Sequence, residues 1–238
     1  MTKLLAIPAL ISLMFLFSSC CEDALTHIIL DDDTVCGEDV NTGYQPVSEN
    51  AKRVLFPIAT DTRLIFVNQA GEEMTLSVKK ATDQKSTLNY KVLCSNYDWN
   101  TCQYEFCNGQ MLDYTFESDP AHGIKIYYSM WVDFVKDDSG TLFDQFSARL
   151  WTDELGLSGG NLRLVADNRG QQLPAELTKP GDWERVVGDT TMLGHPFHDV
   201  TYTNWGMNQG RGIFFQKGLG IIGIYAGNEV IWVLDRVE

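Results

Sequence analysis

The sequence predicts an all-β domain, built as an antiparallel sandwich or a curved, partly closed sheet of about ten to twelve strands. Two observations indicate this class. Apolar residues recur with a period of two in most segments after residue 60, which is typical of half-buried strands. Glycine-containing turns separate these segments, and no convincing amphipathic helix follows the N-terminal apolar stretch.

Several hairpins can be placed along the chain. Residues 63–68 and 74–79 flank "QAGE", which supplies the glycine that a tight turn needs. Residues 102–107 and 110–117 are predicted to pair across Asn108-Gly109, a strong turn signal. The segments 123–135, 143–151 and 161–167 continue the alternation, with "LSGG" (157–160) expected as a separator.

The last part of the chain is expected to form two terminal hairpins. Within residues 211–238, Gly218 and Gly220 are expected to form the first turn, and Gly227-Asn228 the second. The preceding stretch, 189–200, is interpreted as a loop and the start of a strand. Large aromatic residues favour a packed core over an open cavity: Phe66, Phe134, Phe146 and Phe215.

Composition restricts the partners. The formal net charge is −14, so nucleic acid and anionic membrane surfaces are disfavoured. With 44% hydrophobic and 11% aromatic residues, the chain can bury a substantial core.

The N-terminus has the layout of a secretory signal peptide. Lys3 is followed up to Phe17 by apolar residues that only Pro8 and Ser12 interrupt. A membrane-spanning helix is the competing interpretation, because about eighteen uncharged residues precede Glu22 and ~17–25 can cross a bilayer. Pro8 and the lack of a basic flank after the run favour the signal peptide.

"FSSC" (17–20) resembles the lipobox of bacterial lipoproteins, with Phe17 in place of the usual leucine. The resemblance implies cleavage before Cys20 and attachment of lipid, palmitate included, to its sulfur, with ordinary secretion as the alternative. Two or three acyl chains anchor a protein durably. In this family, an aspartate directly after the lipidated cysteine commonly signals retention in the inner membrane. This chain has Cys21 at that position, which implies the outer membrane. Glu22-Asp23 resembles the acidic tag that sends some lipoproteins to the cell surface.

The C-terminal "KGLGIIG" pattern and its final Trp-containing strand also resemble the ending of uncharacterised bacterial lipoproteins. The predicted organisation is a signal peptide (1–19), an acidic tether (20–50) and a single β-rich domain (51–238).

An exported domain favours disulfides. If Cys20 carries the lipid, five cysteines remain, and Cys21, beside the membrane, is expected to be the unpaired one. A hairpin would then bring Cys94 opposite Cys102 and leave Cys36 to pair with Cys107. Zinc is disfavoured because no CxxC pair is present.

Catalytic and metal sites have weak signals. His195 and His198 could share a metal with Asp199, but Pro196 disfavours a helix and strand geometry would separate the two rings. There is no GxSxG elbow, and no catalytic residue, metal or cofactor is assigned. The 32 acidic residues could supply a pair of carboxylates for glycoside cleavage, so an envelope hydrolase stays an alternative.

Binding is the leading functional hypothesis. Aromatic residues and amides combine in two expected loops, whose candidate binding residues are Tyr97, Trp99, Tyr202, Asn204 and Trp205. Flat rings stack on sugars or partner side chains, and the alternative is that the tryptophans close the ends of the core. We therefore expect a membrane-anchored binding or assembly module for a glycan or envelope protein, periplasmic or surface-facing. A carrier of an apolar ligand in a β-cup is a further alternative.

Overall fold

A computed structural model gives the fold of residues 38–94, 103–136, 140–152, 157–181, 184–204, 211–226 and 229–238. Its strands form a single curved sheet, and the only helices among these residues have one turn each. In chain order the elements are β1 (Val40–Gln45), α1 (Glu49–Lys52), β2 (Arg63–Val67), β3 (Glu73–Cys94), β4 (Gln103–Glu117), β5 (Ile124–Phe134), β6 (Leu142–Thr152), β7 (Leu157–Asp167), α2 (Ala175–Thr178), β8 (Glu184–Met192), β9 (His195–Asn204), β10 (Arg211–Gln216), β11 (Gly220–Ala226) and β12 (Glu229–Val237).

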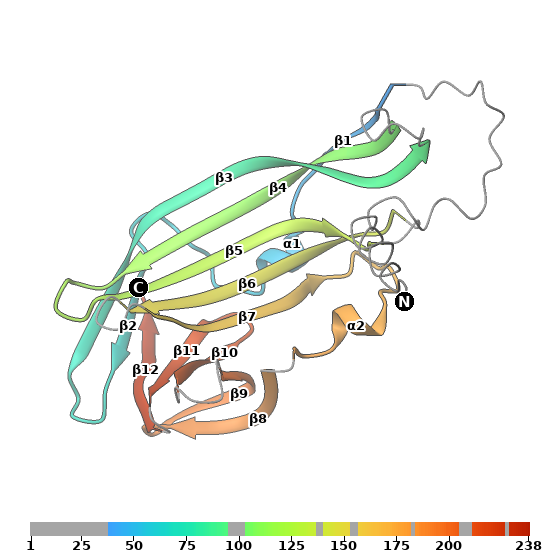
Figure 1. Ribbon diagram of the computed structural model, residues 1–238. Helices are drawn as coiled ribbons and strands as arrows, with labels where there is room; N and C mark the ends of the chain where they lie inside the picture. Colours follow the sequence, from blue (N-terminus) through green and yellow to red (C-terminus); the bar gives the residue numbers. More distant parts are fainter. Residues whose placement is uncertain are drawn as a thin grey trace, which may run out of the picture.

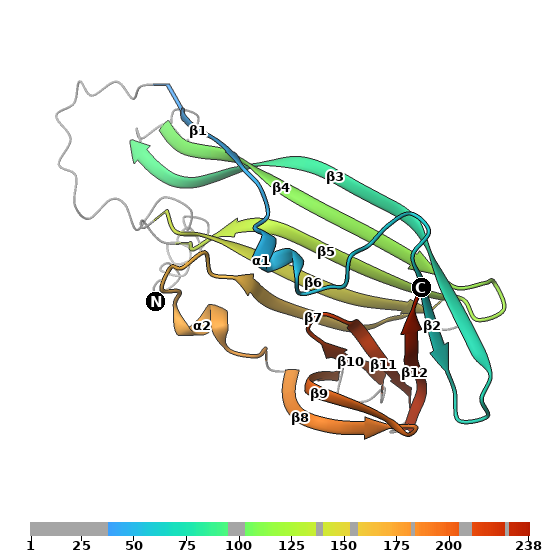
Figure 2. The same cartoon turned by 180° about the vertical axis from the view of Figure 1, so that it is seen from behind.

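The sheet has the strand order β7-β6-β5-β4-β3-β2-β12-β11-β10-β9-β8, and all neighbours along it are antiparallel. Its two halves face each other, with β2 joining them (Figures 1 and 2). We call β3–β7 the large half and β8–β12 the small half. The all-β class and the curved, partly closed sheet are confirmed.

Several predicted elements are also confirmed. β2 and β3 form the first hairpin, with Val67 opposite Glu73. β5 alternates between buried and half-buried residues from Ile124 to Val132. β10, β11 and β12 form the two terminal hairpins.

The predicted turn at Asn108-Gly109 is wrong, because β4 runs straight through it. Asn108 lies opposite Thr87 and Gly109 opposite Ser86, so the pairing with β3 continues. A Cβ atom at Gly109 would lie 2.9 Å from Leu88 Cδ1 and 3.1 Å from Val132 Cβ. The glycine therefore permits close packing rather than a reversal of the chain.

Two other local predictions need correction. Residues 157–160 belong to β7 rather than to a turn. The 189–200 stretch forms the β8–β9 hairpin, in which Leu193 (φ 48°) and Gly194 (φ 86°) connect Met192 to His195. Positive φ at both central residues fits the two-residue turns of tight hairpins, but leucine rarely occupies such a position.

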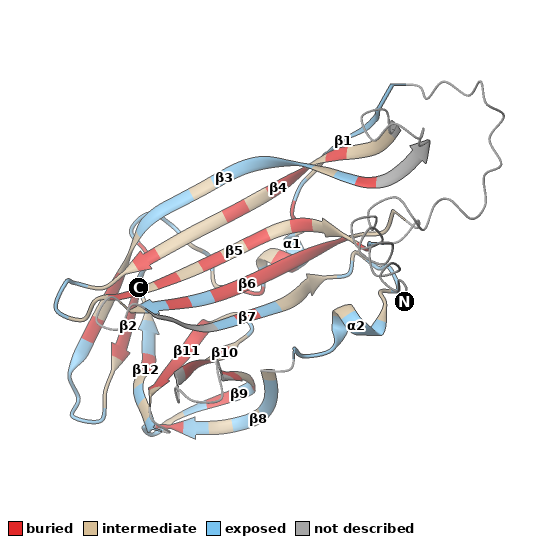
Figure 3. Cartoon of the chain, in the orientation of Figure 1, coloured by how far each residue is buried: buried red, intermediate tan, exposed pale blue. Residues whose placement is uncertain are grey.

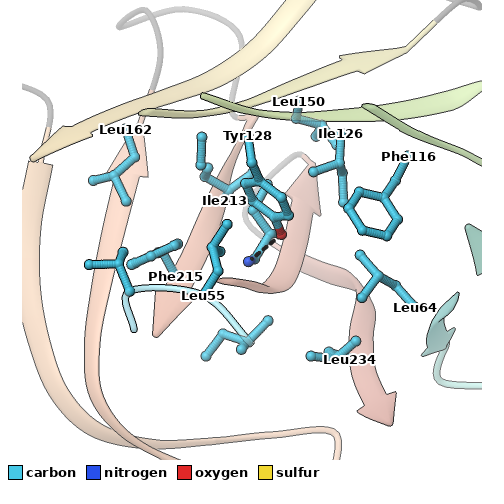
Figure 4. Packing of buried hydrophobic residues seen from close by; sticks show 14 of the residues in the cluster. Leu55, Leu64, Phe116, Ile126, Tyr128, Leu150, Leu162, Ile213, Phe215 and Leu234 are labelled. Atoms are coloured by element: carbon cyan, nitrogen blue, oxygen red, sulfur yellow. Dashed lines mark hydrogen bonds between the residues drawn. The ribbon is translucent and has the colours of Figure 1, made fainter. Parts of the chain in front are cut away.

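Buried residues lie along strands of both halves (Figure 3), and the core between the halves is filled by aromatic and aliphatic side chains (Figure 4). Tyr128 contacts Phe116 and Phe146, each with ring centroids 5.9 Å apart, and Phe146 reaches Phe215 of the small half at 5.3 Å. The Tyr128 hydroxyl accepts a hydrogen bond from the Ile221 N–H at 2.9 Å. This aromatic stack therefore fastens the large half to the small half.

The N-terminal segment is part of the fold from Val40 onward. β1 pairs in parallel with β4, and Val47 is buried. The Ser48 hydroxyl donates a hydrogen bond to Asp167 at 2.6 Å and caps α1. The predicted boundary at residue 51 thus falls inside the described fold.

A buried ion pair secures the same segment. Asp144 is fully buried and pairs with Arg169 at 2.6 Å, and Arg169 also donates to the Pro46 carbonyl at 2.5 Å. The Ser48 hydrogen bond lowers the pKa of Asp167. These contacts hold the start of the domain against β6 and β7.

Candidate functional site

One predicted binding residue, Tyr202, lies in the described structure with its side chain. Asn204 ends β9, but its side chain falls outside the described residues. Cys20, Cys36, Cys102, Tyr97, Trp99 and Trp205 also lie outside them.

Tyr202 belongs to a cluster of three rings that we call the aromatic ladder: Tyr202 on β9, Phe214 on β10 and Tyr225 on β11. Tyr202 stacks on Tyr225 with centroids 4.8 Å apart and an interplanar angle of 29°. Phe214 lies 5.0 Å from Tyr202 and 5.8 Å from Tyr225. Ile213 and Phe215, the neighbours of Phe214 in β10, are buried in the core, so the ladder occupies the outer face of the small half.

A glycine shapes the ladder. Tyr225 lies opposite Gly212, and a Cβ atom at Gly212 would collide with the Tyr225 ring and with the Thr203 carbonyl. Without that atom, Tyr225 crosses β10, and its hydroxyl donates to the Thr203 carbonyl at 3.1 Å. Burial and hydrogen bonding with Tyr202 raise the pKa of Tyr225 far above its usual value, so the hydroxyl remains a donor at physiological pH.

The exposure of the rings decides what the ladder can do. Tyr225 is 4% exposed, whereas Tyr202 and Phe214 are half-buried. Tyr202, whose ring packs on Tyr225 and Phe214, therefore leaves part of its side chain exposed near the end of β9. Such a surface can stack on an apolar sugar face or on a partner's aromatic or apolar side chain.

A second feature is a hollow where β7 meets β9 and β10. It has a volume of about 200 Å³, and its lining residues are Leu164, His198, Asp199, Thr201, Phe215, Gln216 and Lys217. This volume is below the ~300–1,000 Å³ of most ligand pockets. The hollow is therefore a small opening between β7 and the β9–β10 hairpin, smaller than a typical ligand-binding cavity.

The three histidines in the described structure do not converge. His195 lies 4.0 Å from Asp235, whereas His198 lies 3.2 Å from Asp189, and His122 lies 2.9 Å from Asp119. Across the described part of the chain, no group of three or more His, Cys, Asp or Glu side chains could hold a metal ion. Asp199 adopts a left-handed φ of 50° beside His198 and contributes no shared ligand site.

The cysteines are only partly described. β3 and β4 pair on either side of residues 95–102 as expected, but Cys94 lies opposite Gln103 rather than opposite Cys102 as predicted. Cys107 is buried and forms no disulfide with any described residue, and burial raises the pKa of its thiol. The predicted pairs Cys94–Cys102 and Cys36–Cys107 each include a cysteine outside the described residues and remain predictions.

Sequence reasoning identified Tyr202 but not Phe214 and Tyr225. The period of two shows that Phe214 and Phe215 point to opposite faces of the sheet. It does not show that the three rings meet, because that depends on the register of β9, β10 and β11. The available signal was Gly212, a small residue inside an aromatic strand, which often marks close approach by another group.

Comparisons with known proteins place the chain in no family. No family model, curated protein or solved structure matches it. Within the described residues, no helix has the length and apolar character needed to cross a membrane.

Proposed function

We propose that the protein is a lipid-anchored binding module of the bacterial outer membrane and that its aromatic ladder binds carbohydrate. The observation that carries the binding proposal is the half-buried ring of Tyr202, stacked 4.8 Å from buried Tyr225. The anchor is proposed from the lipobox-like "FSSC" that ends at Cys20.

Carbohydrate fits the chemistry of this surface. A supported tyrosine ring offers a flat face for the C–H groups of a sugar and a hydroxyl at its rim. The sequence between β9 and β10 contains Trp205, Asn208 and Gln209, a further ring and two amides, which lie outside the described residues. A net charge of −14 favours neutral sugars over polyanions.

The two alternative functions gain less support. A carrier needs an internal space, whereas Tyr128, Phe146 and Phe215 are buried and in contact between the halves. For a hydrolase with a histidine-activated nucleophile, the three described histidine rings lie near carboxylates rather than near a hydroxyl or thiol. A hydrolase that uses paired carboxylates stays an alternative.

The binding proposal is tested on an array of neutral and acidic oligosaccharides, using the full chain extracted in mild detergent. We expect a neutral oligosaccharide to bind, Tyr202→Ala to weaken binding about tenfold, and Tyr202→Phe to retain most of it because the ring persists. Tyr127→Ala, which removes a half-buried tyrosine from β5 in the large half, is the matched control.

Binding of no oligosaccharide would overturn the carbohydrate assignment. Binding that Tyr202→Ala leaves unchanged would remove the ladder from the site. Thermal melts of each variant separate a lost contact from a lost fold.

The anchor is tested independently by Cys20→Ala. We expect the variant to leave the membrane fraction and lose incorporation of labelled palmitate. Membrane retention at the wild-type level would support a spanning N-terminal segment instead.

A further inference from the structure

Several strands have an edge without a strand partner among the described residues. β7 and β8 end the strand order, and β1 pairs only with β4. β3 pairs with β2 from Glu73 to Ser77 and with β4 up to Cys94. The Val78 N–H still donates to the Thr62 carbonyl at 3.4 Å. Beyond Val78, one side of β3 is an open edge in the described fold.

Three of these four edges are blocked or broken. The pairing of β8 with β9 shifts register on both sides of Gly188, and β1 shifts between Asn41 and Tyr44. On β7, the Arg163 N–H donates to the Glu184 carboxylate at 3.0 Å. Bulges and capped donors are the devices by which proteins prevent edge pairing.

The open edge of β3 is regular instead. From Lys80 to Asn89 its register with β4 continues without a shift, and most side chains of this run are exposed. β3 lies along the border of the molecule in both views (Figures 1 and 2). A regular exposed edge of this kind can accept another strand.

The sequence of this edge is complementary to itself in one antiparallel register. With Gln84 opposite Gln84 of a second copy, Asp83 lies opposite Lys85 twice, once on each side of the two-fold axis. Thr82 then lies opposite Ser86, and Ala81 opposite Thr87. Opposite charges and hydroxyl pairs directly across a ladder both stabilise it.

Contacts within the chain already position these side chains. Gln110 donates to Asp83 at 2.8 Å, and the Lys85 ammonium lies 5.0 Å from the centre of the Tyr44 ring. Gln84 donates to Asp113 at 2.9 Å. Side chains that are ordered before association lose less entropy when they bind.

We propose that two copies of this chain associate through antiparallel pairing of their β3 edges, centred on Gln84. Edge lysines usually oppose strand addition. Asp83 lies between Lys80 and Lys85 in the sequence. In the register centred on Gln84, Asp83 of one copy lies opposite Lys85 of the other copy and neutralises its charge. The contact is small compared with standard protein interfaces, which predicts a weak dimer that depends on concentration.

The full chain, extracted in mild detergent, is examined by sedimentation velocity over a range of concentrations. We expect a monomer–dimer equilibrium that Lys85→Glu or Asp83→Lys weakens about tenfold, because each places like charges opposite each other twice. The double variant Asp83→Lys/Lys85→Asp should restore dimers, and Lys179→Glu, with an equal charge change on an exposed residue elsewhere, should leave them intact.

A cysteine cross-link tests the register even if a charge variant folds poorly. Gln84→Cys should give a disulfide-linked dimer on mild oxidation, whereas Thr82→Cys alone should not. A monomer at every concentration, or a dimer that neither charge reversal weakens, would overturn the proposal. So would equal cross-linking at positions 82 and 84.

Discussion

The molecule contains two aromatic clusters that differ in what covers them. The aromatic stack of the core is buried between the two halves of the sheet and consists of Phe116, Tyr128, Phe146 and Phe215. The aromatic ladder on the outer face of the small half has one buried ring, Tyr225, and two half-buried rings, Tyr202 and Phe214.

The difference teaches which contacts hold the fold and which leave a surface for binding. The Tyr128 hydroxyl receives a hydrogen bond from Ile221 of the opposite half, so its polar group is used in joining the halves. The Tyr225 hydroxyl bonds within the small half, to the Thr203 carbonyl. The stack should therefore control stability, and the ladder should affect stability less.

Truncating one phenylalanine in each cluster should give the largest contrast. We expect Phe146→Ala to lower the free energy of unfolding by about 3–5 kcal/mol, because it opens a cavity between the halves. Phe214→Ala should cost about 1–2 kcal/mol, because its ring is already half-exposed. Urea unfolding measures both, and equal losses would contradict the distinction.

Substituting a glycine beside the aromatic stack should lower the free energy of unfolding almost as much as Phe146→Ala does. Gly220 has a φ of 77°, and a Cβ atom there would lie 2.6 Å from the Tyr128 hydroxyl. We expect Gly220→Ala to cost about 3 kcal/mol through left-handed strain and overpacking.

Gly218 is the matched control, because it has a φ of 84° in the same connection but nothing within 4 Å of its added Cβ. Gly218→Ala should cost about 1–2 kcal/mol, from backbone strain alone. Similar shifts in the urea midpoint for the two variants would show that the Tyr128 contact is unimportant.

Removing a hydroxyl from each cluster should have a smaller effect. Tyr128→Phe leaves the buried Ile221 N–H without its acceptor, which should cost about 1–3 kcal/mol. Tyr202→Phe should change stability by less than about 0.5 kcal/mol, because Tyr202 is half-exposed and the Tyr225 hydroxyl keeps the Thr203 carbonyl as its acceptor. Thermal unfolding at neutral pH compares the two, and reversed effects would contradict the role of Tyr128.

Alkaline pH gives the smallest expected difference. Burial raises the pKa of Tyr128 above its usual value of 10.0. A raised folded-state pKa means that its contribution is complete below pH 10 and is lost as pH rises above it. Wild type should therefore lose about 1.4 kcal/mol more than Tyr128→Phe between pH 9 and pH 11. Parallel losses in urea titrations at these two pH values would argue against this effect.

The success of the sequence predictions depended on how local each signal was. Period two located β5, and the glycine between β2 and β3 marked their turn, because both depend only on neighbouring residues. Asn108-Gly109 misled because the same residues suit a turn or a crowded strand. The pairing with β3 and the packing of Leu88 decided between them.

The candidate site shows the same limit. Tyr202 could be selected as an aromatic residue beside amides, but its partners Phe214 and Tyr225 come from other strands. The β8–β9 hairpin was missed because Leu193 occupies a left-handed position that usually carries glycine or asparagine.

The sequence by itself determined the all-β class, the acidic charge and most strand positions, because alternation, composition and glycine turns are properties of the chain. Only the tertiary structure decided that the sheet folds over an aromatic stack, that three rings meet outside it, and that β3 keeps an open edge. These features depend on strand register, which is set by the simultaneous packing of residues far apart in sequence.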